Sequence, residues 1–277
     1  MELVSFTKMH GLGNDFVIID NREQQLEHRS LPTCAIANRH TGIGCDQLII
    51  LEKPKDDQAD VFMRIFNSDG SEAGACGNAA RCVASIIMTE NKNDHAIIET
   101  LSRILDAHAA ENGLITVDMG LAKMDWRDIP LSKAIDTLHL GIGSGPLQDP
   151  VGINMGNPHA VFFVDNADAI DLPLHCSVLE RHSLFPEHAN ISVATVKDTN
   201  EIRLRVWERG VGETLACGSG ACATLVSASR RSLCGQDALV LLNGGTLYIE
   251  WLADNHIMMT GPVATSFSGF VNPALLD

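Results

Sequence analysis

An internal repeat constrains the fold of this chain more than any other feature of its sequence. Four segments of the first half align, in the same order, with four segments of the second half. The aligned pairs are 10–20 with 154–165, 45–50 with 189–194, 64–78 with 205–219 and 116–120 with 258–261. The offset is 143 residues where Asn14 aligns with Asn157 and Gln47 with Asn190, and 141 where Cys76 aligns with Cys217 and Gly120 with Gly261. Two long copies indicate a duplicated domain, because a solenoid needs several shorter repeats.

The repeat aligns polar residues as well as glycines. The equivalent positions are Asn14 and Asn157, Gln47 and Asn190, Asn67 and Glu208, and Cys76 and Cys217. Such pairs are expected if both copies face one ligand. Coincidence among Gly- and Ala-rich stretches is the alternative, and a nearly constant offset over four segments argues against it.

Each copy has the pattern of an α+β unit. Short apolar or alternating stretches bounded by Gly, Asn and Asp are typical of strands. They fall at 16–20, 47–51, 61–66, 160–165, 202–207 and 238–243. Helical patterns follow the two paired cysteines, at 78–89 and 220–231.

The repeat also suggests where the chain divides. We expect an N-terminal lobe of residues 1–118, completed by residues 263–277, and a C-terminal lobe of residues 119–262, with a cleft between the two. Residues 121–150 have no counterpart in the other copy and are interpreted as a connecting excursion.

The net charge and hydropathy of the chain argue against nucleic acids and membranes as its main partners. The chain of 277 residues carries a formal net charge of −15, whereas nucleic acids and anionic membranes bind clustered Lys and Arg. No apolar stretch approaches 18 residues, and the first residues lack a signal-peptide pattern. We therefore expect a soluble cytoplasmic protein whose eight cysteines are free thiols and whose partner is a small molecule.

The repeated cysteines, Cys76 and Cys217, are the candidate reactive groups. Small, flexible residues separate each from the helix pattern, so each sulfur should lie at a helix N-terminus. Free N–H groups and the helix dipole favour a thiolate there and can also bind a carboxylate. Packing of a buried cysteine is the competing interpretation.

Two thiols beside one bound carboxylate fit the inversion of a stereocentre. That reaction needs a base on one face of the carbon and an acid on the other. Helix N-termini aimed at the carboxylate would stabilise the negative charge that develops on it. A metal site is less consistent, because Cys76–Cys82 and Cys217–Cys222 lack the C-x2-C spacing of structural zinc. A redox pair would normally place both cysteines in one C-x-x-C motif.

The chain closely resembles the diaminopimelate epimerases. The segments that carry the resemblance are KMHGLGNDF (8–16), GCDQ (44–47), NSDGSEAGACGNAARC (67–82), NMGNPHAV (154–161) and WERGVGETLACGSGAC (207–222). The match covers nearly the whole chain. It implies an isomerase, independent of pyridoxal phosphate and of any other cofactor or metal, that interconverts L,L- and meso-diaminopimelate in lysine and cell-wall synthesis. It also implies two pseudo-symmetric lobes, each a sheet or barrel around a central helix, and a homodimer.

The resemblance assigns roles to individual residues. Cys76 and Cys217 become the acid/base pair, supported by His159 and Glu208. The implied substrate-binding residues are Asn14, Gln47, Asn67, Gly77, Asn78, Asn157, Asn190, Glu208, Arg209, Gly218 and Ser219. Arg209 could hold a distal carboxylate with two parallel hydrogen bonds.

Two residues depart from the family pattern. Ala79 stands where glycine is usual, and Phe267 stands where many members have a tyrosine linked to dimer contacts. Two other functions stay open at this point. An epimerase of the same architecture could act on proline, hydroxyproline or another amino acid, or the chain could be a non-catalytic amino-acid-binding or thiol-redox protein.

Overall fold

The structure is a computed structural model that describes residues 4–23, 31–272 and 275. The chain divides into two units. Unit 1 contains Met1–Val117 and Gly261–Asp277, and unit 2 contains Asp118–Thr260. Within the described ranges, every helix is too short or too polar to cross a membrane.

Unit 1 is a sheet wrapped on a central helix, α2. Its strands are β1 (Ser5–Gly11), β2 (Asn14–Asp20), β3 (Gln47–Glu52), β4 (Val61–Asn67), β5 (Glu72–Ala73), β6 (His95–Glu99), β7 (Ile104–Ala109), β8 (Ile115–Leu121) and β19 (Ala264–Phe270). The helices are α1 (Thr33–Ala37), α2 (Gly77–Asn91) and a 3-10 turn at Glu111–Gly113. Pairing runs β19–β1–β2–β3–β4–β6–β7–β8, parallel at β2–β3 and β4–β6 and antiparallel elsewhere.

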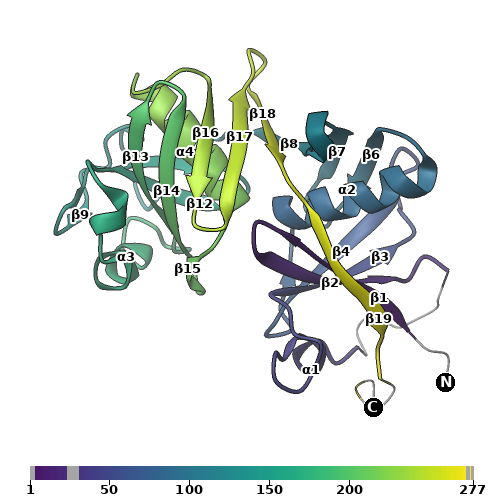
Figure 1. The fold of residues 1–277 in the computed structure, drawn as a ribbon. Helices are drawn as coiled ribbons and strands as arrows, with labels where there is room; N and C mark the ends of the chain where they lie inside the picture. Colours follow the sequence, from purple (N-terminus) through teal and green to yellow (C-terminus); the bar gives the residue numbers. More distant parts are fainter. Residues whose placement is uncertain (1–3, 24–30, 273–274, 276–277) are drawn as a thin grey trace. The chain divides into compact units, whose positions relative to one another are not determined.

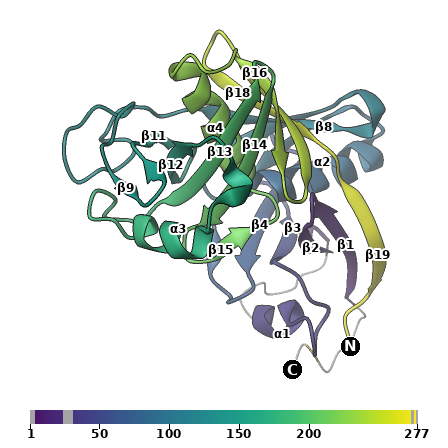
Figure 2. The same cartoon turned by 60° about the vertical axis from the view of Figure 1, so that its left-hand side comes forward.

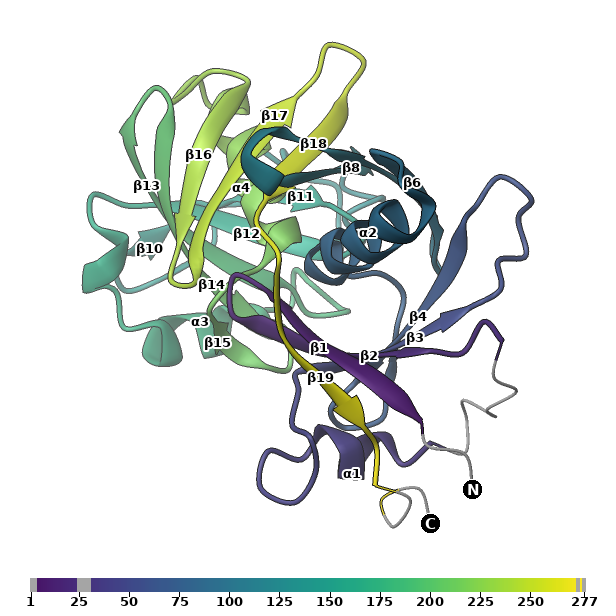
Figure 3. The ribbon, with the colours of Figure 1, turned by 45° about the vertical axis from the view of Figure 1, so that its right-hand side comes forward.

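The sequence of α2 explains its central position. Apart from Arg81, its buried stretch from Asn78 to Ala84 is made of small and apolar residues, so every side of the first turns can be covered. The helix contacts β1, β4, β6 and β7, as Figures 1 and 3 show. It ends at Asn91 and is capped by Lys92, whose left-handed φ of 50° turns the chain toward β6.

Unit 2 repeats this plan around α4. Its strands are β9 (Gly143–Ser144), β10 (Leu147–Gln148), β11 (Val151–Asn154), β12 (Pro158–Phe163), β13 (Asn190–Asp198), β14 (Glu201–Glu208), β15 (Gly212–Thr214), β16 (Asp237–Leu242), β17 (Gly245–Trp251) and β18 (His256–Gly261). The helices are α3 (Leu172–Glu180), α4 (Gly218–Arg230) and a 3-10 turn at Ala167–Ala169. Pairing runs β11–β12–β13–β14–β16–β17–β18, parallel at β12–β13 and β14–β16.

The pairing register confirms the duplication that the sequence predicted. Phe16 lies opposite Gln47 in the parallel pair β2–β3, and His159 lies opposite Asn190 in the parallel pair β12–β13. Each residue of the second pair follows its partner in the first at the offset of 143. The α+β class with two pseudo-symmetric halves is therefore confirmed.

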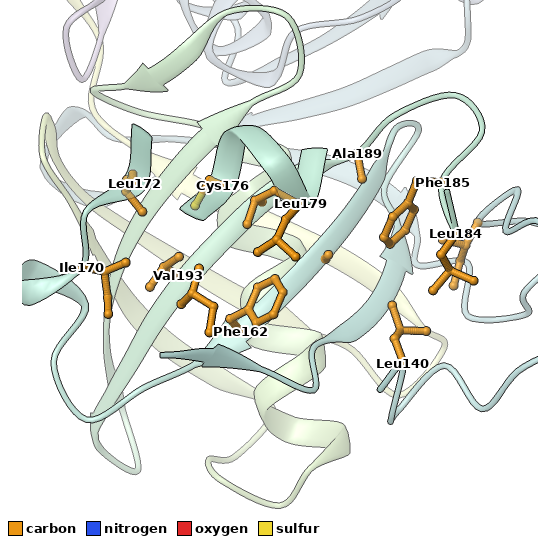
Figure 4. Close-up of a cluster of buried hydrophobic side chains, with 14 of the residues drawn as sticks. Leu140, Phe162, Ile170, Leu172, Cys176, Leu179, Leu184, Phe185, Ala189 and Val193 are labelled. Atoms are coloured by element: carbon orange, nitrogen blue, oxygen red, sulfur yellow. The ribbon is translucent and has the colours of Figure 1, made fainter. Parts of the chain in front are cut away.

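The stretch 121–150 contributes to the core of unit 2. Ile129, Leu131, Leu140 and Leu147 are buried in one cluster with residues of α3 and β13. Figure 4 shows Leu140 beside Phe162 and the apolar side of α3, and Figure 2 shows α3 next to β13 and β15. The sequence interpretation as a connection was thus incomplete, because the connection also covers one face of the sheet.

Candidate active site

Cys76 lies at the N-cap of α2, as the sequence predicted. Its backbone is extended, with φ −147° and ψ 114°, and Gly77 is the first helical residue. The first N–H groups of a helix have no partner within the helix, so α2 directs a partial positive charge toward this end. Cys76 is half-buried, which leaves part of the residue accessible.

Two asparagines of the predicted site surround Cys76. Asn14 Oδ1 lies 3.9 Å from Cys76 Sγ and accepts a hydrogen bond of 3.2 Å from Asn78 Nδ2. Asn14 begins β2 after a turn in which Leu12 and Gly13 have positive φ values of 57° and 85°. Glycine adopts that conformation readily, and this tight turn directs Asn14 toward the helix start.

Gln47 and Asn67 form a second polar pair in unit 1. They lie directly opposite each other in β3–β4, and Gln47 Nε2 donates to Asn67 Oδ1 over 2.9 Å. The buried Oε1 of Gln47 has no partner among the described residues. A buried acceptor without a partner costs free energy, which a donor group on a ligand could recover.

Cys217 occupies the matching N-cap of α4, with φ −129° and ψ 107°. Its side chain is buried, and its Sγ lies 3.5 Å from Ser219 Oγ. A Cβ on Gly220 would lie 3.3 Å from that sulfur and 3.0 Å from Val206 Cγ2. Glycine at position 220 therefore gives the sulfur its space.

Burial controls the protonation of Cys217. Removal from water raises the pKa of the Cys217 thiol well above its usual range, and the carboxylate of Glu208 raises it further. Hydrogen bonds from Ser219 and from the backbone of Gly220 oppose this rise without overcoming it. The helix N-terminus favours the thiolate, but for Cys217 the removal from water has the larger effect on the pKa and acts in the opposite direction.

His159 connects several of the predicted residues in unit 2. Its Nε2 lies 3.0 Å from Asn157 Oδ1 and 3.1 Å from Ser219 Oγ. Burial lowers the pKa of His159 to about 3, and the charge of Arg209 contributes to the decrease. The imidazole is therefore neutral near pH 7 and can exchange hydrogen bonds without carrying charge.

Asn190 and Arg209 belong to the same group of contacts in unit 2. Asn190 Oδ1 accepts from the Arg209 backbone N–H over 2.8 Å, and Asn190 Nδ2 lies 3.5 Å from His159 Nε2. The exposed Arg209 side chain donates to the Glu187 carbonyl over 2.7 Å. Glu208, the last residue of β14, accepts a 2.6 Å hydrogen bond from Thr214 Oγ1.

The sequence analysis missed three residues that support these groups. Arg81 is fully buried and donates to Asn78 Oδ1 over 3.0 Å, and Asp46 Oδ2 accepts from Asn14 Nδ2 over 3.1 Å. The carboxylate of Glu180 accepts from the Gly210 N–H over 3.0 Å and so holds the turn that carries Arg209. The quoted motifs include Arg81 and Asp46, so attention to their charged residues could have found these two, whereas no motif includes Glu180.

One group of described side chains has the composition of a metal site. His95, Asp106 and His108 share one exposed face of β6–β7, and both imidazole Nε2 atoms lie within 2.9 Å of Asp106 Oδ1. Hydrogen bonding of two imidazoles to one carboxylate accounts for this geometry. The group includes neither predicted cysteine.

Comparison with known proteins identifies relatives over nearly the full chain. The family model described as diaminopimelate epimerase matches residues 6–124 and 151–266. A diaminopimelate epimerase of Rhodospirillum centenum is 55% identical over 271 residues, covering 98% of this chain and 93% of the relative. That of Erythrobacter litoralis is 51% identical and covers 96% of each chain.

Solved structures share the fold at low sequence identity. A phenazine biosynthesis protein of the PhzF family from Bacillus anthracis has a TM-score of 0.72 at 16% identity, covering 98% of this chain and all of that one. A hydroxyproline epimerase from Agrobacterium vitis, with bound trans-4-hydroxy-L-proline, has a TM-score of 0.68 at 14% identity. That comparison covers 99% of this chain and 94% of the epimerase.

Proposed function

This chain belongs to the diaminopimelate epimerase family and is an amino-acid epimerase, and we propose that it converts L,L-diaminopimelate to meso-diaminopimelate. The observation that carries this proposal is the pair of cysteines at matching helix N-caps, one in each copy of the repeat. Proton transfer at the α-carbon would pass between these two thiols, with no cofactor. The proposal includes a role in lysine and peptidoglycan precursor synthesis.

The reacting carboxylate binds at the starts of the two helices. The backbone N–H groups of Gly77–Asn78 and Gly218–Ser219 are the donors in this proposal. Such donors stabilise the enediolate-like charge that develops when the α-proton leaves, and they need no rearrangement as it forms. A removed donor of this kind typically lowers a rate by a factor of about 10² to 10³.

The two cysteines begin the reaction in different protonation states. Because burial and Glu208 raise the pKa of Cys217, Cys217 begins as the thiol and donates a proton to the planar intermediate. Cys76 is then the thiolate that removes the α-proton. For the reverse reaction the roles exchange, and the two groups titrate as one coupled system.

The remaining polar residues select the substrate. Arg209 forms a bidentate ion pair with the distal carboxylate, after its side chain leaves the Glu187 carbonyl. Neutral amides contact the zwitterionic ends of the substrate, and the unpartnered Oε1 of Gln47 is available to accept from an ammonium group. His159 and Glu208 support the Cys217 side of the reaction.

The assembly and location of the enzyme are also proposed here. We expect a homodimer in the cytoplasm that acts on a small molecule and binds no nucleic acid. Phe267 in β19 replaces a tyrosine that is common in relatives, and its ring packs edge-on against Phe6 with centroids 5.9 Å apart. Sedimentation velocity would give the oligomeric state.

The decisive experiment is α-proton exchange in D2O. Purified, reduced enzyme without added cofactor should incorporate deuterium into L,L-diaminopimelate and produce the meso isomer, as NMR would record. Proline and trans-4-hydroxyproline are run alongside, because a hydroxyproline epimerase shares the fold. Turnover of either cyclic amino acid in place of diaminopimelate would overturn the substrate assignment, and the absence of all exchange would overturn the reaction.

A second measurement tests the protonation state of Cys217. Iodoacetamide reacts with thiolates, so site-resolved mass spectrometry can follow each cysteine as pH increases. We expect Cys217 to label only at alkaline pH, because its pKa is raised. Rapid labelling of Cys217 at neutral pH would contradict its assignment as the initial thiol.

A further inference from the structure

A continuous chain of hydrogen bonds crosses the Cys76 half of the site. It begins at the Arg81 guanidinium, which donates to Asn78 Oδ1 over 3.0 Å. Asn78 Nδ2 donates to Asn14 Oδ1 over 3.2 Å, and Asn14 Nδ2 donates to Asp46 Oδ2 over 3.1 Å. Two amides thus lie in series between a cation and a carboxylate.

The two ends of this chain determine its direction. A guanidinium has only donors and a carboxylate has only acceptors, whereas an amide offers one group of each kind. Arg81 must therefore face an amide oxygen and Asp46 must face an amide N–H2 group. If either asparagine were rotated by 180° about its amide axis, two donors or two acceptors would face each other. Only one orientation of both amides satisfies all three of these hydrogen bonds.

The two ends have different surroundings. Arg81 is fully buried in α2, and a Cβ on Gly11 would lie 3.0 Å from its terminal nitrogen, so the end of β1 packs directly on the guanidinium. Asp46 is fixed by a 2.7 Å ion pair with Arg39, and its Oδ2 also accepts from the Asp15 N–H over 3.1 Å. The Arg81 end is therefore buried, whereas the Asp46 end is exposed and is defined by its hydrogen bonds.

We propose that Arg81 and Asp46 are positioning residues that set the amide orientation of Asn14 toward the reactive thiol of Cys76. In this orientation the Asn14 oxygen faces Cys76 Sγ at 3.9 Å and is available to accept from its S–H. With the amide rotated, the N–H2 group would face the sulfur and would favour the thiolate throughout the cycle. The fixed oxygen lets Cys76 carry a proton after it has removed one from the substrate. This inference rests on the proposed role of Cys76.

Unit 2 has no equivalent of either end of this chain. The positions that match Arg81 and Asp46 at the repeat offsets are Cys222 and Ala189, both buried and uncharged. There the equivalent amide, Asn157, meets the neutral ring of His159. The charged ends are therefore specific to the Cys76 half and are not a requirement of the duplicated backbone.

Neutron diffraction from crystals of the wild-type enzyme tests the orientation directly, since deuterium distinguishes the oxygen and nitrogen of an amide. We expect deuterium on Asn14 directed at Asp46 and deuterium on Asn78 directed at Asn14. Density for the opposite orientation of Asn14 would overturn the proposal. This measurement is independent of substrate, so its outcome does not depend on whether diaminopimelate is the correct ligand.

A double-mutant cycle tests the effect on catalysis. Arg81→Gln replaces a group that only donates hydrogen bonds, and Asp46→Asn replaces a group that only accepts them. Each substitution introduces an amide, which can do both. Each single variant retains the other end, so the double variant should lose about tenfold or more in kcat/KM beyond the product of the single losses. Arg81→Lys, which still only donates, should recover most of the activity lost in Arg81→Gln.

Two other outcomes would overturn the proposal. If charge alone mattered, the single variants would shift the pH dependence of Cys76 alkylation in opposite directions, and the double variant would return it to the wild-type value. If the two residues acted independently, the losses would simply multiply. The ion pair of Arg22 with Glu90 at the other end of α2 supplies the control cycle, Arg22→Gln with Glu90→Gln, which should leave kcat/KM unchanged. Circular dichroism checks whether Arg81→Gln folds. If this variant does not fold, the neutron structure of the wild-type enzyme still tests the amide orientation.

Discussion

The two copies of the repeat share a backbone plan but differ in the chemistry around each cysteine. Cys76 is half-buried and faces an amide fixed between a cation and a carboxylate. Cys217 is buried, faces a serine hydroxyl and lies within the influence of Glu208. Duplication alone would give two identical thiols, whereas stereoinversion needs one base and one acid at the same time. In our proposal, the burial of Cys217 and the neighbouring carboxylate of Glu208 supply that difference, because both keep Cys217 protonated.

The largest expected effect comes from removing either thiol. Cys76→Ser and Cys217→Ser should each lower the rate of net epimerisation by a factor of about 10² to 10⁴, because each removes one general acid/base. The variants should differ in exchange. Cys217→Ser retains the proposed base and should still incorporate deuterium into the L,L substrate, whereas Cys76→Ser should not. NMR in D2O measures both quantities, and equal exchange in the two variants would contradict the assignment.

A second difference between the halves concerns acid sensitivity. His159 has a pKa of about 3 in the folded protein, below the value of about 6.5 in an unfolded chain. Between these two pKa values the unfolded chain binds a proton at this histidine and the folded protein does not. The contribution of His159 to the free energy of unfolding is therefore fully present above about pH 6.5 and decreases as pH falls toward 3. At pH 4.5 the titration of His159 should lower the free energy of unfolding by about 3 kcal/mol relative to neutral pH.

His159→Gln removes this titration, so the free energy of unfolding of the variant should depend less on pH than that of the wild type. Its equivalent in unit 1 is Phe16, which cannot titrate. All three tryptophans, Trp126, Trp207 and Trp251, lie in unit 2, so their fluorescence during urea unfolding reports the relevant unit. His188→Asn, at an exposed position of the same unit, is the control. If the variant and the wild type lost equal stability between pH 7.5 and 4.5, burial of a neutral His159 would be refuted.

The start of α4 is less tolerant of an added methyl group than the start of α2. Gly220→Ala would place a Cβ 3.0 Å from Val206 and 3.3 Å from the sulfur of Cys217. We expect a loss of about 1–3 kcal/mol in the free energy of unfolding, together with a displaced sulfur and a lower kcat. Thermal unfolding and steady-state kinetics measure the two effects, and an unperturbed kcat would show that the sulfur has more space than the structure indicates.

The reciprocal change in α2 should have the smallest effect. Ala79 occupies the position equivalent to Gly220 and is already fully buried. Ala79→Gly removes that methyl group and should cost about 0.5–1 kcal/mol through the greater freedom of the unfolded chain, with kcat retained. A large gain in kcat would mean that the alanine obstructs the approach of the substrate to α2. Denaturant unfolding and initial rates distinguish these outcomes.

The sequence predicted the parts of the structure that depend on local pattern and repetition. The helices α2 and α4 begin within two residues of the predicted starts, and the N-cap positions of Cys76 and Cys217 follow from the flanking glycines. The repeat also predicted that Gln47 and Asn190 would occupy equivalent positions in their sheets.

Contacts between distant residues could not be predicted in this way. The burial of Arg81 depends on the close approach of Gly11, and the turn with Arg209 depends on a carboxylate from α3. The direction of the Cys217 pKa shift depends on burial, which a motif does not specify. These are consequences of tertiary packing, and the sequence indicates the residue types without their neighbours.

The pairing of β19 with β1 has a consequence for how the protein is made. β1 is synthesised before unit 2, yet its antiparallel partner β19 follows all of unit 2. On the ribosome, unit 2 is contiguous and can fold while β1 still has an unpaired edge. An open edge is a site of aggregation until it is covered. Unit 1 is therefore expected to be completed last, and truncations before Ala264 should yield a folded unit 2 attached to an aggregation-prone unit 1.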